Sequence, residues 1–389
     1  MRNIGILFDI NEGWIGGSYY LRNLVAALGM LPAEEQPVAT LISARPDSVR
    51  FMQETGYPHL RWLDAGAFNA APGRFPLDAL FPWAPPSEAA RTVSWIPDFQ
   101  ELHLPYYCSP DEIANRRRHY RQRFATAGLV VSSEAVRRDV EQFFPGECRN
   151  VAVVHFATFD HFDRSRQASV RAAYGLTGPY VMCANQVWVH KNHILILKAL
   201  AILKARGLTP TVCFTGNESD YRVKGFSTYL RDKAAEWGIA DTVRFLGFIP
   251  RDDQLNLMAG AQYVVQPSLF EGWSTVVEDA KAMGQFVVAS DLDVHKEQLT
   301  GNCRFFARHD PDALAAIMAD LAQSPQTPGP QGDYNEARRS FGRDFLAAIT
   351  AFLPPDRAAE RSGPDMMTSA EFEAQTRQSI DSLASDPQH

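Results

Sequence analysis

Short, continuously apolar runs recur along the chain, and longer amphipathic stretches separate them. Because the runs do not alternate apolar with polar residues, they are typical of parallel strands that helices cover on both faces. In the first half the pattern predicts strands at Ile4–Ile10, Val38–Ser43, Val93–Ile96, Leu129–Ser132 and Val151–His155. In the second half it predicts strands at Tyr180–Ala184, Thr211–Thr215, Val243–Leu246, Tyr263–Gln266 and Phe286–Ala289. Strands that alternate with helices favour α/β architecture with two Rossmann-like, doubly wound parallel sheets.

The 389 residues are enough for two hydrophobic cores. The polar segment Ala157–Leu176 has no strand-like run, and we interpret it as the connection between two domains. We therefore expect a Rossmann-like N-terminal domain over residues 1–165 and a Rossmann-like C-terminal domain over 166–353. The last helix, near 335–353, is a candidate to pack back on the N-terminal domain. The tail 354–389 is rich in Pro, Ser, Asp, Glu and Gln, and we expect it to be weakly attached.

Composition narrows the class of protein. The formal net charge of −7 argues against a general nucleic-acid binder, which needs a basic face. No run approaches the roughly 20 apolar residues that span a bilayer. The first residues do not resemble a signal peptide, because Asp9 and Glu12 interrupt the apolar run. The five cysteines are scattered, without the spacing of a metal site, so we expect reduced thiols, a cytoplasmic protein and no metal.

A basic helix is predicted after Ser109-Pro110-Asp111-Glu112, which has the capping-box arrangement. It carries five arginines, which spread around most of the helix: Arg116, Arg117, Arg118, Arg121 and Arg123. Two interpretations stay open. The arginines form an ordinary solvated face, or they contact anionic lipid headgroups or a lipid-linked acceptor at the inner face of the membrane.

Two segments of the first half carry candidate chemistry. Gly13–Ser18 follows the first strand, and its paired glycines Gly16 and Gly17 allow a ligand to approach the backbone at a strand-to-helix turn. A plain tight turn is the alternative. The second segment, Trp95–His103, lies at the carboxyl end of a strand, which borders the ligand crevice in open α/β sheets. Its polar residues are candidates for a direct role or for turn and capping contacts: Asp98, Gln100, Glu101 and His103.

A third segment, Ala184–His193, connects a strand to the helix predicted at Ile194–Arg206. Lys191 adds a full positive charge to the partial positive charge of the helix N-terminus. This combination favours a pyrophosphate site. A surface lysine beside an asparagine cap is the alternative.

The fourth segment, Gln266–Gly284, is the most specific. A strand ends, Glu271 and Gly272 turn the chain, and a helix is predicted to begin near Ser274 or Thr275. The apolar stripe of this helix consists of Val276, Val277, Ala280, Met283 and Gly284. Relative to that stripe, helical geometry places Glu278 toward solvent and Asp279 on the flank. Glu271 and Asp279, rather than Glu278, are therefore expected to face one crevice.

Together these segments resemble family 4 of the retaining glycosyltransferases, which have the GT-B fold of two Rossmann-like domains facing a central cleft. The family signature is Glu, seven residues, Glu, and here it corresponds to Glu271 and Asp279. The segments EGWSTVVE, WIPDFQ and HKNH look like those of one bacterial branch of the family. The resemblance extends to about Phe352.

The resemblance implies roles for particular residues. Glu271 would contact hydroxyls of the donor sugar, Asp279 would hold the ribose hydroxyls, and Lys191 would neutralise the donor diphosphate. Asp98 and His103 are candidates for acceptor-side or acid–base help. Further residues are expected at the donor site: Gly16, Gly17, Gln186, Gly272, Trp273, Ser274 and Thr275.

Two positions depart from the family pattern. Asp279 is one methylene shorter than the usual Glu, which puts its reach to the ribose in question. Gln186 stands where many members have Arg, which leaves one fixed cation on the diphosphate.

The reaction implied by the resemblance is transfer from a nucleotide-diphosphate sugar, with retention and without a metal or other cofactor. The acceptor would be a glycan or a lipid-linked glycan, in polysaccharide or glycolipid synthesis. The alternatives are a nucleotide-sugar 2-epimerase on the same fold and a non-catalytic nucleotide-sugar-binding protein.

Overall fold

The structure is a computed structural model that describes residues 2–84, 91–326, 329, 333–353, 367, 371 and 374. Two compact units make up the chain. The first consists of Met1–Asp98, Ala114–Phe159 and Asn335–His389, and the second of Phe99–Ile113 and Asp160–Tyr334. The tail predicted at 354–389 falls, apart from three positions, outside the described residues.

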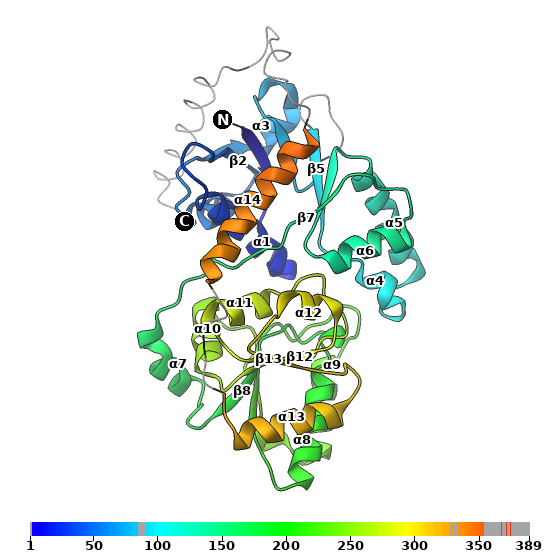
Figure 1. The fold of residues 1–389 in the computed structure, drawn as a ribbon, viewed down its shortest axis with the longest axis vertical. Helices are drawn as coiled ribbons and strands as arrows, with labels where there is room; N and C mark the ends of the chain where they lie inside the picture. Colours follow the sequence, from blue (N-terminus) through cyan, green and yellow to red (C-terminus); the bar gives the residue numbers. More distant parts are fainter. Residues whose placement is uncertain are drawn as a thin grey trace. The chain divides into compact units, whose positions relative to one another are not determined.

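The first unit is built on a parallel sheet with strand order β3-β2-β1-β4-β5-β6-β7 (Figure 1). Its strands are β1 (Asn3–Leu7), β2 (Val38–Ser43), β3 (Leu60–Asp64), β4 (Ala79–Phe81), β5 (Arg91–Ile96), β6 (Gly128–Val131) and β7 (Val151–Val153). Its helices are α1 (Ile15–Leu28), α2 (Pro46–Gln53), α3 (Ala65–Ala70), most of α5 (Pro110–Phe124), α6 (Glu134–Phe143) and all but the first residue of α14 (Tyr334–Phe352), with 3₁₀ turns η1 (Glu12–Trp14) and η2 (Pro72–Arg74).

The second unit has a parallel sheet with strand order β10-β9-β8-β11-β12-β13. Its strands are β8 (Tyr180–Cys183), β9 (Thr211–Phe214), β10 (Val243–Phe245), β11 (Val264–Gln266), β12 (Val287–Ser290) and β13 (Cys303–Phe306). Its helices are α4 (Gln100–His103), α7 (Gln167–Ala173), α8 (His193–Ala205), α9 (Phe226–Glu236), α10 (Arg251–Gly260), α11 (Thr275–Met283), α12 (Asp293–Gln298) and α13 (Pro311–Gln323). The 3₁₀ turns are η3 (Pro105–Tyr107), η4 (Arg164–Arg166), η5 (Val189–Lys191) and η6 (Ala240–Thr242).

Each sheet has the doubly wound strand order in which the direction of winding reverses once. The reversal lies between β1 and β4 in the first unit and between β8 and β11 in the second. Ligands of open α/β sheets bind outside the carboxyl ends of the strands at this reversal. In the second unit, the segments that follow β8 and β11 therefore border the expected ligand crevice.

The predicted fold of two Rossmann-like parallel α/β units is confirmed, and each predicted strand is present, with small differences in its ends. The most shifted end is that of β1, which stops at Leu7 rather than Ile10. Three strands were not predicted: β3, β4 and β13. The strands β3 and β13 lie at sheet edges and carry half-exposed or exposed residues, so neither is a continuous apolar run. The strand β4 is short, with only three residues.

Helix α14 packs in the first unit. Phe341 and Phe345 are fully buried, and their rings contact Tyr20 and Phe81 respectively. Gly342 allows this close packing, since a Cβ there would lie 2.3 Å from the carbonyl oxygen of Ala27 in α1. Among the described residues, no helix is both long enough and apolar enough to cross a membrane.

Candidate functional site

Glu271 lies in the loop after β11, at the winding reversal of the second unit, and one of its oxygens is heavily hydrogen-bonded. Oε1 accepts from Lys191 Nζ at 2.6 Å, Ser268 Oγ at 2.6 Å and Gln266 Nε2 at 2.8 Å. The Glu271 side chain is 8% exposed and that of Lys191 is 17% exposed. Three donors on one oxygen fix the orientation of the carboxylate. Oε2 accepts from none of the described residues and is therefore the oxygen that a ligand can use.

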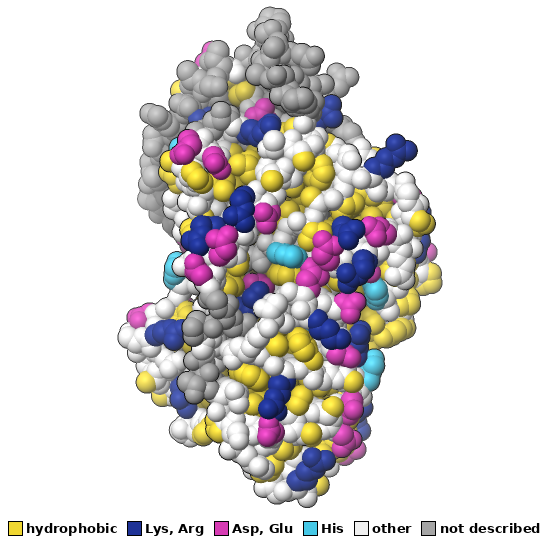
Figure 2. All heavy atoms as spheres, viewed as in Figure 1, with side chains coloured by type: hydrophobic (Ala, Val, Ile, Leu, Met, Phe, Trp, Pro, Cys, Tyr) yellow, Lys and Arg dark blue, Asp and Glu magenta, His cyan; other side chains and the backbone are white. Residues whose placement is uncertain are grey.

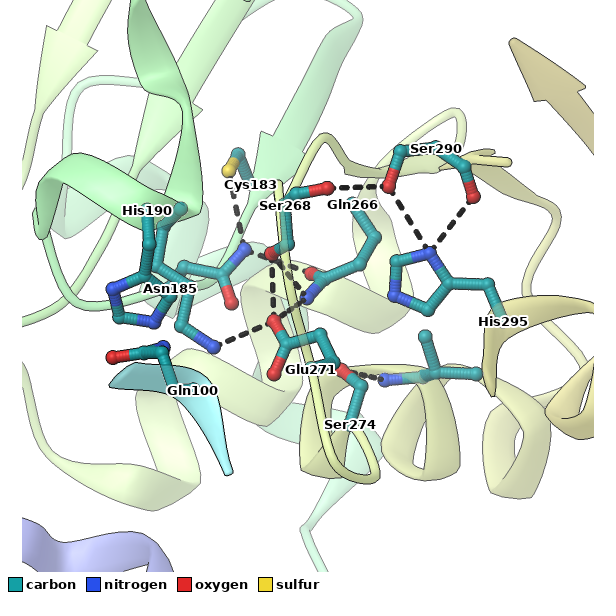
Figure 3. A network of polar contacts seen from close by, with 12 residues as sticks. Gln100, Cys183, Asn185, His190, Gln266, Ser268, Glu271, Ser274, Ser290 and His295 are labelled. Atoms are coloured by element: carbon teal, nitrogen blue, oxygen red, sulfur yellow. Dashed lines mark hydrogen bonds and ion pairs between the residues drawn. The ribbon is translucent and has the colours of Figure 1, made fainter. Parts of the chain in front are cut away.

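A second layer of contacts holds these donors in place (Figure 3). Asn185 donates from Nδ2 to Gln266 Oε1 at 2.8 Å, which orients the Gln266 amide so that its nitrogen faces Glu271. Ser290 Oγ donates to the carbonyl oxygen of Ser268 at 2.6 Å. His295 completes the layer, with Nδ1 2.9 Å from the carbonyl oxygen of Ser290. Burial lowers the pKa of His295, so its ring is neutral at pH 7.

Lys191 is brought to Glu271 by the connection between β8 and α8. The turn η5 ends at Lys191, and Asn192 then adopts a left-handed conformation (φ 58°) before α8 begins at His193. Asn192 Nδ2 donates to the carbonyl oxygens of Pro267 and Arg308, which fastens this turn to the loop after β11. The prediction that Lys191 lies at the entrance of a helix is confirmed.

Helix α11 begins at Thr275, with Ser274 as its N-cap; Ser274 Oγ accepts from the backbone nitrogen of Val277 at 3.3 Å. The expectation that Glu278 points to solvent is wrong. Its side chain is 1% exposed and accepts from Lys281 Nζ, Gln298 Nε2 and Tyr334 Oη, at distances of 2.9, 3.1 and 2.9 Å. Helix α12 and Tyr334, both of the second unit, therefore cover the face of α11 that the helical pattern assigned to solvent.

Asp279 is also buried, and its partner is Arg251 at the start of α10. Both carboxylate oxygens of Asp279 accept from Arg251 Nη2, at 2.7 and 2.8 Å. Asp160 accepts from the same guanidinium, at 2.8 Å from Nη2 and 3.0 Å from Nε. Burial disfavours the charged form of Arg251, but the two carboxylates outweigh this and raise its pKa. In this structure Asp279 is therefore one of two carboxylates bound to Arg251, and its contact with a ribose stays a prediction.

The paired glycines of the first unit lie in the first turn of α1, not in the turn before it. A Cβ on Gly17 would lie 2.6 Å from the ring of Trp14, whereas a Cβ on Gly16 would have its nearest neighbour at 3.9 Å. The Trp14 ring stacks on Trp95, which in turn stacks on Tyr20 with ring centroids 3.8 Å apart. Gly17 is thus explained by aromatic packing, and a role of Gly16 and Gly17 in donor binding stays a prediction.

The segment Trp95–His103 divides between the two units. Asp98 is half-buried at the end of the first unit's segment, while Gln100 and His103 belong to α4 in the second unit. The His103 ring lies against Phe270, the neighbour of Glu271, with centroids 4.8 Å apart. His103 is therefore placed near the candidate site, and the role of Asp98 stays a prediction.

The remaining predicted donor residues surround the same loops. Gln186 is half-buried after β8, Gly272 is buried, and Trp273 is half-buried with Lys281 Nζ 5.9 Å from its ring centre. Within the described ranges, no three His, Cys, Asp or Glu side chains come together as a metal site would require.

The arginines of α5 are partly engaged within the first unit. Arg117 and Arg121 lie over the ring of Phe144, Arg121 pairs with Glu147, and Arg123 lies over Trp83. On the face shown in Figure 2, basic and acidic side chains are interspersed. Membrane contact through this helix stays a prediction.

Several residues of the site were not singled out in the sequence: Asp160, Gln266, Ser268, Arg251, Ser290, His295 and Gln298. The position of Gln266 and Ser268 at the carboxyl end of a predicted strand was a usable signal. Arg251 lies 28 residues from Asp279 and 91 residues from Asp160 in the sequence, so no local pattern indicated these contacts.

Residues 170–339 match the family model described as glycosyl transferases group 1. The chain is 28% identical over 239 residues to the D-inositol 3-phosphate glycosyltransferase of Streptomyces scabiei, covering 57% of this chain and 52% of that protein. It is 25% identical over 249 residues to the O-antigen chain mannosyltransferase B of Escherichia coli, covering 62% and 63%. The aligned regions thus span about half to two thirds of these relatives. The family model thus matches less than half of the chain, and the relatives that the chain resembles are glycosyltransferases.

Solved structures of similar fold cover nearly the whole chain. Anabaena Alr3699/HepE in complex with UDP and glucose has a TM-score of 0.63 at 15% identity, over 99% of this chain and 100% of that chain. The sucrose-phosphate synthase of Thermosynechococcus elongatus has a TM-score of 0.60 at 13% identity, over 99% and 100%. At these identities the likeness shows the fold, which is GT-B.

Proposed function

We propose that this protein is a glycosyltransferase that transfers a sugar from a nucleotide-diphosphate sugar, with retention of anomeric configuration and without a metal. The observation that carries the proposal is the Lys191–Glu271 pair at the winding reversal of the second unit, inside the region that matches glycosyl transferases group 1. HepE, of the same fold, binds UDP and glucose, which supports a nucleotide sugar as the donor.

In the proposed reaction, departure of the nucleotide places negative charge on its diphosphate. Lys191 and the N-terminus of α8 supply fixed positive charge for that group, which is the kind of preorganised electrostatic stabilisation that lowers a barrier most. The free Oε2 of Glu271 binds donor sugar hydroxyls, while the leaving diphosphate itself takes the acceptor proton. A metal is then not needed to stabilise the leaving group.

The acceptor in this proposal is a glycan or a lipid-linked glycan, in polysaccharide or glycolipid synthesis. The similarity to the O-antigen chain mannosyltransferase B of Escherichia coli supports this choice of acceptor. Asp279, held by Arg251, is proposed to reach the ribose. His103, beside Phe270, is proposed to act on the acceptor side.

The test is release of nucleoside diphosphate from a panel of UDP- and GDP-sugars, in the presence and absence of glycan acceptors. Lys191→Met should lose donor turnover, because the cation opposite the leaving group is gone. Lys198→Met is the matched control, since Lys198 is exposed on the same helix α8. Release without any acceptor, accompanied by a changed sugar, would indicate an epimerase instead. Binding without turnover that Lys191→Met leaves unchanged would indicate a non-catalytic binding protein.

A further inference from the structure

A buried ion pair in the loop after β9 is not used by the function proposed above. The side chains of Asp220 and Arg222 are 0% and 4% exposed. Asp220 Oδ1 accepts from Arg222 Nε at 3.2 Å, and Oδ2 accepts from the backbone nitrogen of Val189 at 2.9 Å. The pair therefore lies against the turn η5 that carries Lys191.

The two terminal nitrogens of Arg222 reach two different segments of the second unit. Nη2 is 2.9 Å from Nδ1 of His190, and Nη1 donates to Oε1 of Gln100 at 2.5 Å. Because a guanidinium only donates, Nδ1 of His190 must be the bare, accepting nitrogen. This fixes the tautomer with the proton on Nε2. Burial, with the nearby charges of Lys191 and Arg222, lowers the pKa of His190 and keeps the ring neutral.

The contacts of Arg222 with His190 and Gln100 join it to segments that carry residues of the candidate site. His190 precedes Lys191, and the carbonyl oxygen of His190 accepts from the backbone nitrogen of Leu269 at 2.8 Å, two residues before Glu271. Gln100 begins the short helix α4, which ends at His103. Figure 3 shows Gln100 and His190 on the same side of the network around Glu271.

We propose that Arg222 is a positioning residue that sets Lys191 and α4 relative to Glu271. The expected effect on turnover rests on the proposed function, whereas the contacts of Arg222 do not depend on it. A buried ion pair contributes little stability compared with apolar replacements. What a planar, five-donor guanidinium supplies here, and a lysine cannot, is simultaneous contact with Asp220, His190 and Gln100.

The first test is kinetic and uses Arg222→Lys, which keeps a cation for Asp220 and so preserves the fold. Because misplacement of reacting groups by about 1 Å costs on the order of a hundredfold, kcat should fall by about tenfold to a hundredfold while the donor KM stays close to that of the parent. Gln100→Ala removes the contact between Arg222 and α4 and should lower kcat less. In the Arg222→Lys background Gln100→Ala should have a smaller effect than in the parent, because the contact between residue 222 and Gln100 is already lost.

Arg304→Lys is the matched control, since Arg304 pairs with Asp320 on the surface. Equal turnover in Arg222→Lys and Arg304→Lys would overturn the proposal, as would full additivity of Arg222→Lys with Gln100→Ala.

The second test is independent of activity and separates failure of this proposal from failure of the proposed function. In the ¹⁵N spectrum of the imidazoles, His190 of the parent should show a bare Nδ1 and a protonated Nε2. Arg222→Lys should give a mixture of the two tautomers. An unchanged His190 spectrum would refute positioning by Arg222, even for a protein that turns over no nucleotide sugar.

Discussion

At the scale of single residues, Glu271 combines a fixed orientation with one oxygen left to a ligand. In Glu271→Gln the carbonyl oxygen still accepts from Gln266 and Ser268, so the fold should be retained. The variant loses the charge that pairs with Lys191 and that strengthens hydrogen bonds to sugar hydroxyls. A hydrogen bond to a charged group is worth about 1.5–3 kcal/mol. This corresponds to a loss of about 10- to 150-fold in kcat/KM.

The measurement is initial rates with the nucleotide sugar that the parent uses, alongside thermal unfolding to check the fold. Normal turnover by a folded Glu271→Gln would remove Glu271 from the site.

The burial of His193 predicts that the free energy of unfolding depends on pH. Its ring is fully buried against Phe214, and burial lowers its pKa to about 3. The unfolded chain takes up this proton near pH 6.5, but the folded chain does not. The contribution of His193 is therefore fully present above pH 6.5 and is lost as the pH falls from 6.5 toward 3, by about 1.4 kcal/mol per pH unit.

Urea unfolding at several pH values between 4.5 and 7.5 measures this slope. His193→Leu should reduce the slope by one proton below pH 6.5, and an identical slope in both proteins would contradict the assignment. The other buried histidines, His190 and His295, are unchanged in this comparison.

At the scale of elements, the start of α1 offers a matched pair of substitutions. Gly17→Ala places a methyl group 2.6 Å from the Trp14 ring, so the stack of Trp14 on Trp95 must shift. Overpacking of this kind costs about 1–3 kcal/mol. Gly16→Ala has room, and replacing glycine in a helix gains up to about 1 kcal/mol. Chemical denaturation followed by tryptophan fluorescence should show the two variants changing the free energy of unfolding in opposite directions.

Helix α11 gives the second prediction at this scale, because Glu278 is buried with three partners. Glu278→Ala leaves Lys281 without its buried partner, and breaking a buried pair costs about 3–5 kcal/mol. Glu236→Ala is the control, since Glu236 pairs with Lys233 at the same spacing on α9 but is 58% exposed. In Glu236→Ala the free energy of unfolding should change by no more than about 0.5 kcal/mol. Similar values for both variants would mean that the face of α11 bearing Glu278 is solvated.

Helix α11 also shows which structural features the sequence predicts and which it does not. Continuous apolar runs such as Val38–Ser43 identified the central strands, and the turn chemistry of Ser274 identified the start of α11, since both signals are local. The assignment of Glu278 to solvent assumed that one face of α11 is exposed. That face is covered by Gln298 and Tyr334, which lie 20 and 56 residues away and carry no local signal. The ion pair of Lys191 with Glu271, 80 residues apart, was not predicted; the family resemblance implied only that both residues belong to the donor site.

At the scale of the whole molecule, the chain does not fill its two units in sequence order. Residues 99–113, from the first half, cluster with the second unit, and α14 returns to the first. The donor-side residues Lys191, Glu271 and Asp279 all belong to the second unit, whereas the core of α14 belongs to the first. We therefore expect that the stability of the first unit and the occupation of the donor site can be perturbed separately.

Phe345→Ala tests this separation. Phe345 is fully buried against Phe81, and truncation of a buried phenylalanine costs about 3–5 kcal/mol. The variant should unfold at lower denaturant, yet a nucleoside diphosphate bound at the second unit should retain its dissociation constant in isothermal titration calorimetry. A hundredfold excess of ligand over that constant should still add about 2.7 kcal/mol to the stability of the state that binds it. If Phe345→Ala instead weakened ligand binding in proportion to its loss of stability, the two units would not be energetically independent, and the donor site would depend on the packing of α14.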